Sequence, residues 1–384
     1  MIYLDNSATT PLCQAAKDKM IAAMEVFGNP SSLHDGGLAA EKLVEEARSS
    51  LFSALAIRNP RAWELIFTAS GSEANNQLLF GVLRAKKFRF TPRVITTDSE
   101  HPSVAEPLAV LEREGVEVVR LSTKGGAIQM DELAAAVNEN TVLVSIMTVN
   151  NETGAKYDIQ KAFRIAKAKN RNLITHTDCV QGFLKVKFSP ELMGADAVTI
   201  SSHKIHGPKG VGALLLSKAL ITAKRVTPLI YGGGQENGMR SGTENVMGIA
   251  GFGAAASVGA SSLADFTVKM PKLREIFLSH LHKDIRVNTP SDYAPHIISI
   301  TLPKIRSEIM LHRLSEDGIY VSSGSACANN KKGSNYVLPA FGLTPAEADT
   351  TLRISLAYET SKADLILAAE KLNAAYESLS LVIK

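Results

Sequence analysis

The segment from residue 64 to residue 216 alternates short runs rich in β-branched residues with longer amphipathic stretches. The short runs are ELIFT, RVITT, EVVRL, TVLVSIMTV, NLITHTD, DAVTISS and GVGALLL. The stretches 73–83, 102–112 and 159–168 have the apolar spacing of helices. This βαβ rhythm is typical of a parallel sheet that helices cover on both faces. We therefore predict an α/β fold with a large domain built on a mostly parallel seven-stranded sheet between helices.

The pattern changes near Ser262, where long helical stretches surround short strands such as HIISITLP and LRISL. A chain of 384 residues is also long enough for two domains. We predict a large domain at 13–255 and a smaller α+β domain made of 1–12 and 256–384. A cleft between two such domains is the expected ligand site.

Composition excludes several classes of protein. A net charge of +4 is too small and diffuse to predict direct binding of nucleic acid. The first residues, MIYLDNSATTP, lack the features of a secretory signal, and the apolar run 246–260 predicts a buried helix rather than a membrane span. Three cysteines are too few for a disulfide framework or a thiolate metal site, so we expect no metal and a cytoplasmic location.

Two strand ends carry residues that suit a pyridoxal phosphate pocket. LITHTDCVQ ends with Asp178 and Gln181, and AVTISSHKIHGPKG brings Ser201, His203 and Lys204 to the end of the next strand. Ligands bind open α/β sheets at these carboxyl ends. A lysine can form the Schiff base with the cofactor, while a carboxylate keeps its pyridine nitrogen protonated. The alternative for Lys204 is an ordinary solvent-exposed lysine in a loop rich in glycine and proline.

Two further strand ends add candidate cofactor contacts. FTASGSEANN places Ser70, Gly71 and Ser72 where a strand passes into a helix, which is a natural site for a phosphate group. A simple helix cap is the alternative there. His101 follows the strand RVITT, where an imidazole can stack on a flat ring and move protons. A structural histidine is the alternative.

Three other motifs are compatible with the same site. Asn150 and Asn151 follow another strand, although adjacent asparagines also serve local turns. The glycine-rich GGGQENGMRSGTEN, with Arg240 and Thr243, could approach a phosphate. TLRISL places Arg353 on a strand of the smaller domain, where a guanidinium can bind a substrate carboxylate through two hydrogen bonds. An ordinary salt bridge is the alternative for Arg353.

VSSGSACANNKKGSNY surrounds Cys327 with small residues and then with two lysines. A positive, exposed neighbourhood favours the thiolate and therefore a nucleophilic cysteine. Cys13 and Cys179 lie in apolar patterns instead, which is typical of structural cysteines.

Taken in order, these motifs resemble the cysteine desulfurases of the class V aminotransferase family, which have the fold type I pyridoxal-phosphate architecture. The matching segments are FGNPSSLHDGG, TASGSEANN, VSIMTVNNETG, HTDCVQ, SSHKIHGPKGVGAL, GGGQENGMRSGTEN, SGSACAN and LRISL. The resemblance runs from YLDNSATTP to the last expected helix. Ser202 and Ala357 stand where this family often has glycine, and both are small changes.

The resemblance implies a role for each residue around the cofactor ring. Lys204 would carry pyridoxal 5'-phosphate, and Asp178 would pair with the ring nitrogen. Gln181 and Asn151 would hold the hydroxyl side of the ring, while His101 would stack on it.

The resemblance also implies how the phosphate is held. Gly71, Ser72, Ser201 and His203 would bind it within one subunit, and Thr243 would reach in from a partner subunit. A homodimer follows, because the family completes its site across a two-fold interface.

By the same resemblance, the reaction converts L-cysteine to L-alanine. Arg353, helped by Asn29, would hold the substrate carboxylate, and Lys204 with His101 would move protons. Cys327, on a long flexible loop of the smaller domain, would take the sulfur as a persulfide and pass it to an acceptor protein. The acceptor could be an iron–sulfur scaffold or a tRNA-thiolation enzyme, although the chain ends soon after the last expected helix, which argues against the general scaffold.

Rival functions remain open on sequence alone. An aminotransferase or a selenocysteine lyase of the same fold would keep the cofactor and change the reaction. SGSACAN argues against plain transamination, which needs no mobile thiol. A carrier protein that has lost turnover is a third reading, and the combination of Lys204, Asp178, His101, Cys327 and Arg353 disfavours it.

Overall fold

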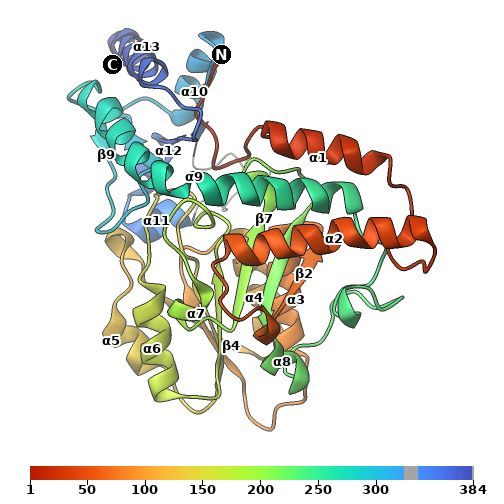
Figure 1. Cartoon of the computed structure of the whole chain (residues 1–384). Helices are drawn as coiled ribbons and strands as arrows, with labels where there is room; N and C mark the ends of the chain where they lie inside the picture. Colours follow the sequence, from red (N-terminus) through yellow and green to blue (C-terminus); the bar gives the residue numbers. More distant parts are fainter. Residues whose placement is uncertain (324–335, 383–384) are drawn as a thin grey trace.

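A computed structural model describes residues 1–323 and 336–382 of the chain (Figure 1). At its centre lies a seven-stranded sheet of order β2-β8-β7-β6-β5-β3-β4. Strand β8 is antiparallel to both of its neighbours, and the remaining pairs are parallel. The strands are β2 (Trp63–Thr68), β3 (Arg93–Thr97), β4 (Glu117–Leu121), β5 (Thr141–Ser145), β6 (Ile174–Asp178), β7 (Ala197–Ser201) and β8 (Gly212–Ser217). The predicted mostly parallel sheet is confirmed.

Helices cover both faces of this sheet. One face packs against α2 (Asp35–Ala54), α5 (Met130–Ala136), α6 (Ile159–Lys169), α7 (Pro190–Met193) and the first half of α9 (Val246–Ser279). The other face packs against α3 (Gly71–Leu83), α4 (Pro102–Arg113) and α8 (Lys218–Thr222). Successive strand residues alternate between the two cores, as Leu65 and Ile66 do, because side chains alternate across a strand.

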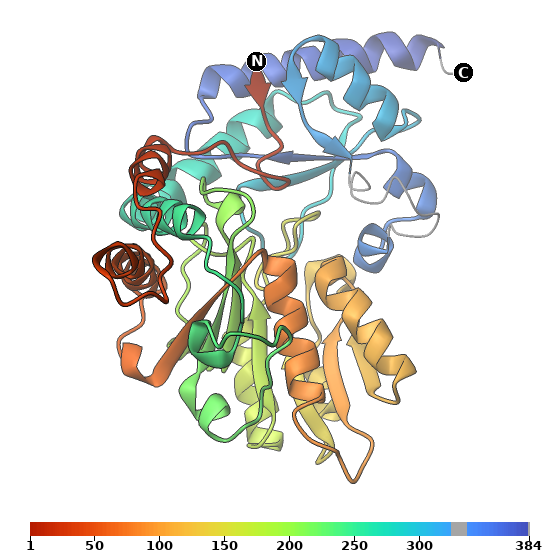
Figure 2. The ribbon, with the colours of Figure 1, turned by 90° about the vertical axis from the view of Figure 1, so that its right-hand side faces the viewer.

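A second, smaller sheet lies beyond the carboxyl ends of the parallel strands (Figure 2). It is antiparallel, with the order β12-β13-β10-β9. Its strands are β9 (Arg286–Val287), β10 (Ile297–Thr301), β12 (Ser322–Ser323) and β13 (Thr351–Ser355). The helices of this part are α10 (Ser307–Glu316), α11 (Val337–Phe341), α12 (Pro345–Asp349) and α13 (Lys362–Val382).

The first residues of the chain belong with this second sheet in space. Strand β1 (Ile2–Tyr3) pairs in parallel with β11 (Ile319–Tyr320), and Asp5 forms a bridge with Ser355. The chain then crosses to α1 (Gln14–Met24), and α9 lies between α1 and α2 (Figure 1). Residues 5–9 therefore run between the two sheets.

Helix α9 differs from the sequence prediction. The apolar run 246–260 and the residues that follow it form one helix of 34 residues that continues through Pro271. The helix continues because Met270, Leu273 and Phe277 are buried in the core of the smaller sheet, which offsets the lost hydrogen bond at proline. Among the described residues, α9 alone is long and apolar enough to span a membrane, but it packs against α1 and α2 as a core helix.

We propose that residues 13–255 form the large domain and that residues 1–12 and 256–384 together form the smaller domain. Its support is that the smaller sheet has a core of its own, which includes Leu4 and the second half of α9. The first half of α9 belongs to the core of the large sheet. The proposed boundary therefore falls inside a continuous helix, which leaves little freedom for the two parts to move independently.

Candidate active site

A cavity of about 290 Å³ lies at the carboxyl ends of the parallel strands. Strands β6 and β7 bring residues to it directly, while β3 and β5 are followed by loops that do so. It is lined by Ser7, Ala8, Ser70, Gly71, Ser72, His101, Ser103, Met147, Val149, Asn151, Asp178, Val180, Gln181, Ser201, His203, Lys204 and Arg353. The lining combines apolar side chains with charged groups of both signs. Such a mixture is typical of a small-molecule site.

Lys204 lies in a single turn of 3-10 helix, Ser202–Lys204, directly after β7. Its Nζ donates to the backbone carbonyl of Ser7 at 2.5 Å and to that of Ala8 at 2.7 Å. The segment between the two sheets therefore holds the amine at the cavity wall. A lysine held there is positioned to react with a carbonyl compound in the cavity.

Asp178 ends β6, and its carboxylate is almost fully buried. Oδ1 accepts from the backbone N–H of Val180 at 2.9 Å, and Oδ2 accepts from Asn75 Nδ2 at 2.8 Å. A carboxylate can accept about four hydrogen bonds, so Asp178 keeps acceptor capacity toward the cavity that it lines. It can therefore pair with a protonated ring nitrogen.

The N-terminus of α3 points its first amides at the same cavity. Ser70 is the N-cap, and its Oγ accepts from the backbone N–H of Glu73 at 3.1 Å. The N–H groups of Gly71 and Ser72 precede that bond and have no partner within a helix. Glu73 is turned away, because its carboxylate pairs with Arg240 at 2.8 Å. Two amides without an acceptor inside the helix, at the positive end of 13 helical residues, favour an anion.

Two histidines border the cavity as neutral rings. Burial and the positive charge of Lys204 lower the pKa of His203 to about 4. Burial also lowers the pKa of His101, while the negative charge of Asp178 opposes this shift and that of Lys204 adds to it. A neutral His101 can lie flat against an aromatic ligand without repelling a cationic ring nitrogen.

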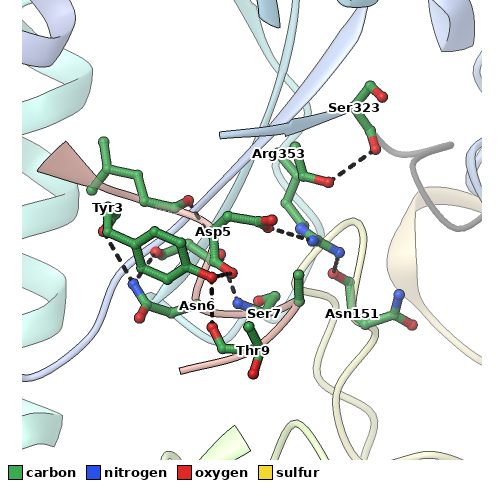
Figure 3. A network of polar contacts seen from close by, with 12 residues as sticks. Tyr3, Asp5, Asn6, Ser7, Thr9, Asn151, Ser323 and Arg353 are labelled. Atoms are coloured by element: carbon green, nitrogen blue, oxygen red, sulfur yellow. Dashed lines mark hydrogen bonds and ion pairs between the residues drawn. The ribbon is translucent and has the colours of Figure 1, made fainter. Parts of the chain in front are cut away.

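Arg353 approaches the cavity from strand β13 of the smaller sheet. Its Nη2 pairs with Asp5 Oδ1 at 2.8 Å, and its Nη1 donates to the backbone carbonyl of Asn151 at 3.0 Å (Figure 3). Its Nε, also buried, has no hydrogen-bond partner among the described residues. The guanidinium thus keeps donors for a carboxylate that enters the cavity.

The structure brings ten of the predicted site residues to this one cavity. They are Gly71, Ser72, His101, Asn151, Asp178, Gln181, Ser201, His203, Lys204 and Arg353. The amide of Gln181 already bonds the backbone carbonyl of Ser7 at 2.9 Å and Lys185 Nζ at 3.2 Å. Gln181 therefore offers a cofactor only one remaining hydrogen and one remaining lone pair.

Two predicted residues among those described, Asn29 and Thr243, do not line the cavity. Asn29 is exposed in the turn before α2, where its Oδ1 accepts from the Ser31 amide. Thr243 lies at a separate hollow beside Arg240 and the carboxyl end of β2. Cys327 lies outside the residues that the structure describes.

Residues that the sequence did not single out also shape the site. Asp5 and Asn75 bond to predicted site residues, and Ser103 links Asn75 to His101. Lys185 lies behind Gln181, where burial and the nearby charges of Lys204 and Arg353 lower its pKa to about 7. The only sequence signal for Asn75 was a polar residue one helical turn after Gly71, which is too common a pattern to interpret.

The two described cysteines differ in exposure. Cys179 is fully buried in the main core, and burial raises the pKa of its thiol. Cys13 is partly exposed and precedes α1. Neither forms a disulfide. The described residues also contain no group of three or more histidine, cysteine, aspartate or glutamate side chains that could hold a metal ion.

The set of groups in the cavity fits pyridoxal phosphate. Lys204 supplies the amine, Asp178 a partner for the ring nitrogen, and the N-terminus of α3 a place for the phosphate. The side chain that Gly71 lacks would meet Val180 Cγ2 at 3.0 Å and Ser201 Cβ at 3.3 Å. A side chain at this position would push these neighbours aside by a few tenths of an ångström, so glycine favours the close approach of the helix terminus to the ends of β6 and β7.

Comparison with known proteins agrees with this geometry. A model of the Aminotransferase class-V family matches residues 2–367. Cysteine desulfurase IscS of Dictyoglomus turgidum is 35% identical, over 98% of this chain and 95% of its own. A solved NifS-like protein shares 34% identity and a TM-score of 0.90, over 99% of both chains. A second solved structure, SspA in complex with cysteine, is 29% identical with a TM-score of 0.78, over 93% of this chain and 99% of its own. The chain therefore belongs to the class V aminotransferase family, within its cysteine desulfurases.

Proposed function

We propose that the chain uses pyridoxal phosphate to convert L-cysteine to L-alanine and takes the sulfur onto Cys327 as a persulfide. The observation that carries the proposal is the convergence of Lys204, Asp178, His101 and Arg353 on one cavity. These residues come from distant parts of the chain and from both sheets. A purely structural role does not explain why a buried carboxylate, a buried guanidinium and a partly buried lysine all line the same cavity.

The family resemblance assigns a role to each cofactor-binding residue, and the fact that all of them except Thr243 line one cavity supports these assignments. Lys204 would bind its aldehyde carbon, Asp178 its ring nitrogen, and Asn151 and Gln181 its hydroxyl side. Gly71, Ser72, Ser201 and His203 would hold its phosphate. When bound, the cofactor supplies an electron sink that stabilises negative charge on the carbon skeleton of an amino acid.

Arg353 would bind the substrate carboxylate through the guanidinium N–H groups that do not bond to Asp5 or Asn151. An amino acid held this way lies between the smaller sheet and the end of β6. Lys204 Nζ, once released from the cofactor, lies on the same wall as Ser7 and Ala8 and can take the proton from the α-carbon. Asn29 stays a predicted substrate contact, since its side chain lies outside this cavity.

The sulfur transfer balances without an external oxidant. The Cys327 thiolate attacks the sulfur of the substrate, an S–S bond forms, and the bond from that sulfur to the β-carbon breaks. The electron pair stays with the carbon fragment, which takes a proton and leaves as alanine. The protein keeps a persulfide on Cys327, and reduction or transfer to an acceptor restores the thiol.

The proposal includes partners. Thr243 would complete the phosphate site of a second copy, so the working unit would be a homodimer. The sulfur acceptor would be an iron–sulfur scaffold or a tRNA-thiolation enzyme. A cytoplasmic location suits the chemistry, because Cys327 must remain a thiol between turnovers. The cysteine complex of SspA supports the choice of substrate.

The direct test incubates protein loaded with pyridoxal phosphate with L-cysteine, with and without a thiol reductant. Alanine is quantified, and mass spectrometry locates added sulfur on each of the three cysteines. We expect alanine to form and the extra sulfur to be confined to Cys327. Cofactor binding without alanine or persulfide would contradict the proposal and favour transamination, which a keto acid product would reveal.

Matched cysteine variants sharpen this test. Cys327→Ala should abolish persulfide and reduce alanine formation by orders of magnitude. Cys13→Ala is the control, because Cys13 is the more exposed of the two described cysteines and should be dispensable. Full turnover by Cys327→Ala would contradict the proposed role of Cys327. Parallel assays with L-selenocysteine would measure which of the two substrates the site prefers.

A further inference from the structure

The side chain of His101 is bound on one side by Ser103. His101 is the N-cap of α4, and its Nδ1 accepts from the backbone N–H of Ser103 at 3.1 Å. The Oγ of Ser103 lies 2.8 Å from the same nitrogen. A backbone N–H can only donate, so Nδ1 must be an acceptor without a proton. In the neutral ring, the proton is therefore on Nε2.

Asn75 determines which way the hydroxyl of Ser103 points. Asn75 is completely buried, and its Nδ2 lies 2.8 Å from Ser103 Oγ and 2.8 Å from Asp178 Oδ2. The NH₂ group of the Asn75 amide must face Asp178. In the flipped orientation the amide oxygen would face the carboxylate, and two acceptors cannot form a hydrogen bond. Both hydrogens of Nδ2 are then used, one on each partner. Ser103 Oγ accepts from Asn75 with one of its two lone pairs, and since Nδ1 of His101 carries no proton, the 2.8 Å contact between them is a bond that the hydroxyl donates.

We propose that Ser103 and Asn75 are positioning residues that hold His101 in its neutral form with the proton on Nε2. Protonation at Nδ1 would bring a new N–H against the backbone N–H of Ser103, so that this hydrogen bond would be lost, and the hydroxyl of Ser103 would have to turn its own hydrogen away from the ring. The charged groups that act on the ring are Asp178, which favours the imidazolium, and Lys204, which disfavours it. Asp178 favours protonation of the ring, whereas the N–H of Ser103 disfavours protonation at Nδ1. Asn75 donates a hydrogen bond to each of these two residues.

The consequence concerns the reaction and rests on the proposed function. A ring held in this form has an N–H donor at Nε2 and cannot accept a proton at that nitrogen. His101 would therefore orient and donate hydrogen bonds, while Lys204 would be the group that takes the proton from the substrate. The tautomer itself does not depend on any turnover, so it can be tested separately.

The test is nuclear magnetic resonance of protein labelled with ¹⁵N-histidine and loaded with the cofactor, with the cofactor-free protein in parallel. The chain has nine histidines, and the His101→Gln variant identifies the signals of His101. We expect an unprotonated Nδ1 and a protonated Nε2 across neutral pH. In Ser103→Ala the pKa of His101 should rise by about one unit, which corresponds to one buried hydrogen bond.

Two further variants keep the interpretation clear. Ser103→Thr retains the hydroxyl and should restore the wild-type titration of His101. Ser99→Ala is the matched control, because Ser99 is also buried near His101 but its hydroxyl bonds Tyr157 at 3.0 Å. Ser99→Ala should leave the His101 signals unchanged. If Ser103→Ala does not fold, Asn75→Ala should produce the same upward shift through the freed Ser103 hydroxyl.

The proposal fails if the wild-type ring carries its proton on Nδ1, or if Ser103→Ala leaves both the tautomer and the pKa of His101 unchanged. A failure of the desulfurase reaction would look different, because no alanine would form while the His101 signals stayed as expected. Where the protein is active, the acid limb of the kcat/KM profile should shift upward in Ser103→Ala and return in Ser103→Thr. A merely structural serine would lower activity without moving that limb.

Discussion

Asp5 and Arg353 form an ion pair of 2.8 Å between residues that lie 348 positions apart (Figure 3). Asp5 lies just after β1, and Arg353 lies on β13, which is one of the two central strands of the smaller sheet. Tyr3 supports this segment, since its hydroxyl donates to the backbone carbonyl of Thr9 at 2.8 Å. The ion pair therefore sets the direction in which the guanidinium meets the cavity.

We expect Asp5→Ala to raise the KM for L-cysteine about tenfold and to leave kcat within about twofold. Arg353 would lose the partner that orients it, and a charge-assisted hydrogen bond is worth about 1.5–3 kcal/mol. Asp5→Asn keeps an acceptor oxygen and should retain most of the wild-type affinity. Steady-state kinetics at several cysteine concentrations checks this. If both variants instead lowered the KM equally, Asp5 would act as a competing charge rather than as an orienting group.

Glu100, the residue before His101, should make stability depend on pH. It is 1% exposed, and burial raises its pKa from the usual 4.5 to about 8. Between these values the folded protein holds a proton that the unfolded chain has released, so stability falls as the pH rises. The fall is at most about 1.4 kcal/mol per pH unit.

The Glu100→Gln variant isolates this effect. Glutamine can still accept from the backbone N–H of Met147, as Oε1 of Glu100 does at 3.0 Å, but it does not titrate. We expect the variant to gain stability relative to the wild type as the pH rises from 5 to 8. Denaturant unfolding at four pH values measures the difference. Parallel stability curves would show that Glu100 titrates normally.

Gly212 lets the N-terminus of α3 lie against strand β8. A Cβ at this position would lie 2.5 Å from the backbone carbon of Ser70 and 2.7 Å from the backbone nitrogen of Gly71. Backbone atoms cannot move aside as a side chain tip can, so Gly212→Ala should displace the helix end. We expect a loss of about 1–3 kcal/mol in stability and weaker cofactor binding.

Thermal unfolding and titration with pyridoxal phosphate measure the two effects of Gly212→Ala. Gly36→Ala is the control, because its Cβ would meet nothing closer than 3.4 Å. Cofactor affinity unchanged in a stably folded Gly212→Ala protein would argue against the phosphate site at α3.

Thr243 provides a test of the proposed homodimer. Lys204→Ala alone should be inactive, and Thr243→Ala alone should bind the cofactor weakly. In a mixed dimer of the two variants, one site would combine Lys204 of one chain with Thr243 of the other and would be intact. We expect the mixed dimer to regain about half of the wild-type activity per dimer. No gain over the separate variants would place Thr243 in the site of its own chain.

The strands and helices of the large sheet could be predicted from the sequence because their signals are local. The run RVITT forms β3 over residues 93–97, because β-branched residues in a short buried run favour a strand. Longer runs were less accurate, and TVLVSIMTV forms a strand only over its first five residues. The predicted buried helix at 246–260 is too short, since α9 continues to Ser279 because its second half is buried in the core of the smaller sheet.

The sequence by itself determined which chemical groups the site contains, since Lys204, Asp178 and His101 follow strands whose ends must meet at one edge of a parallel sheet. Only the tertiary structure decided how those groups are paired. Asn75 lies between Ser103 and Asp178, and Asp5 meets Arg353, because separate segments pack together there. The strength of such pairs depends on burial and on distances of a fraction of an ångström. No local pattern in the sequence encodes either quantity.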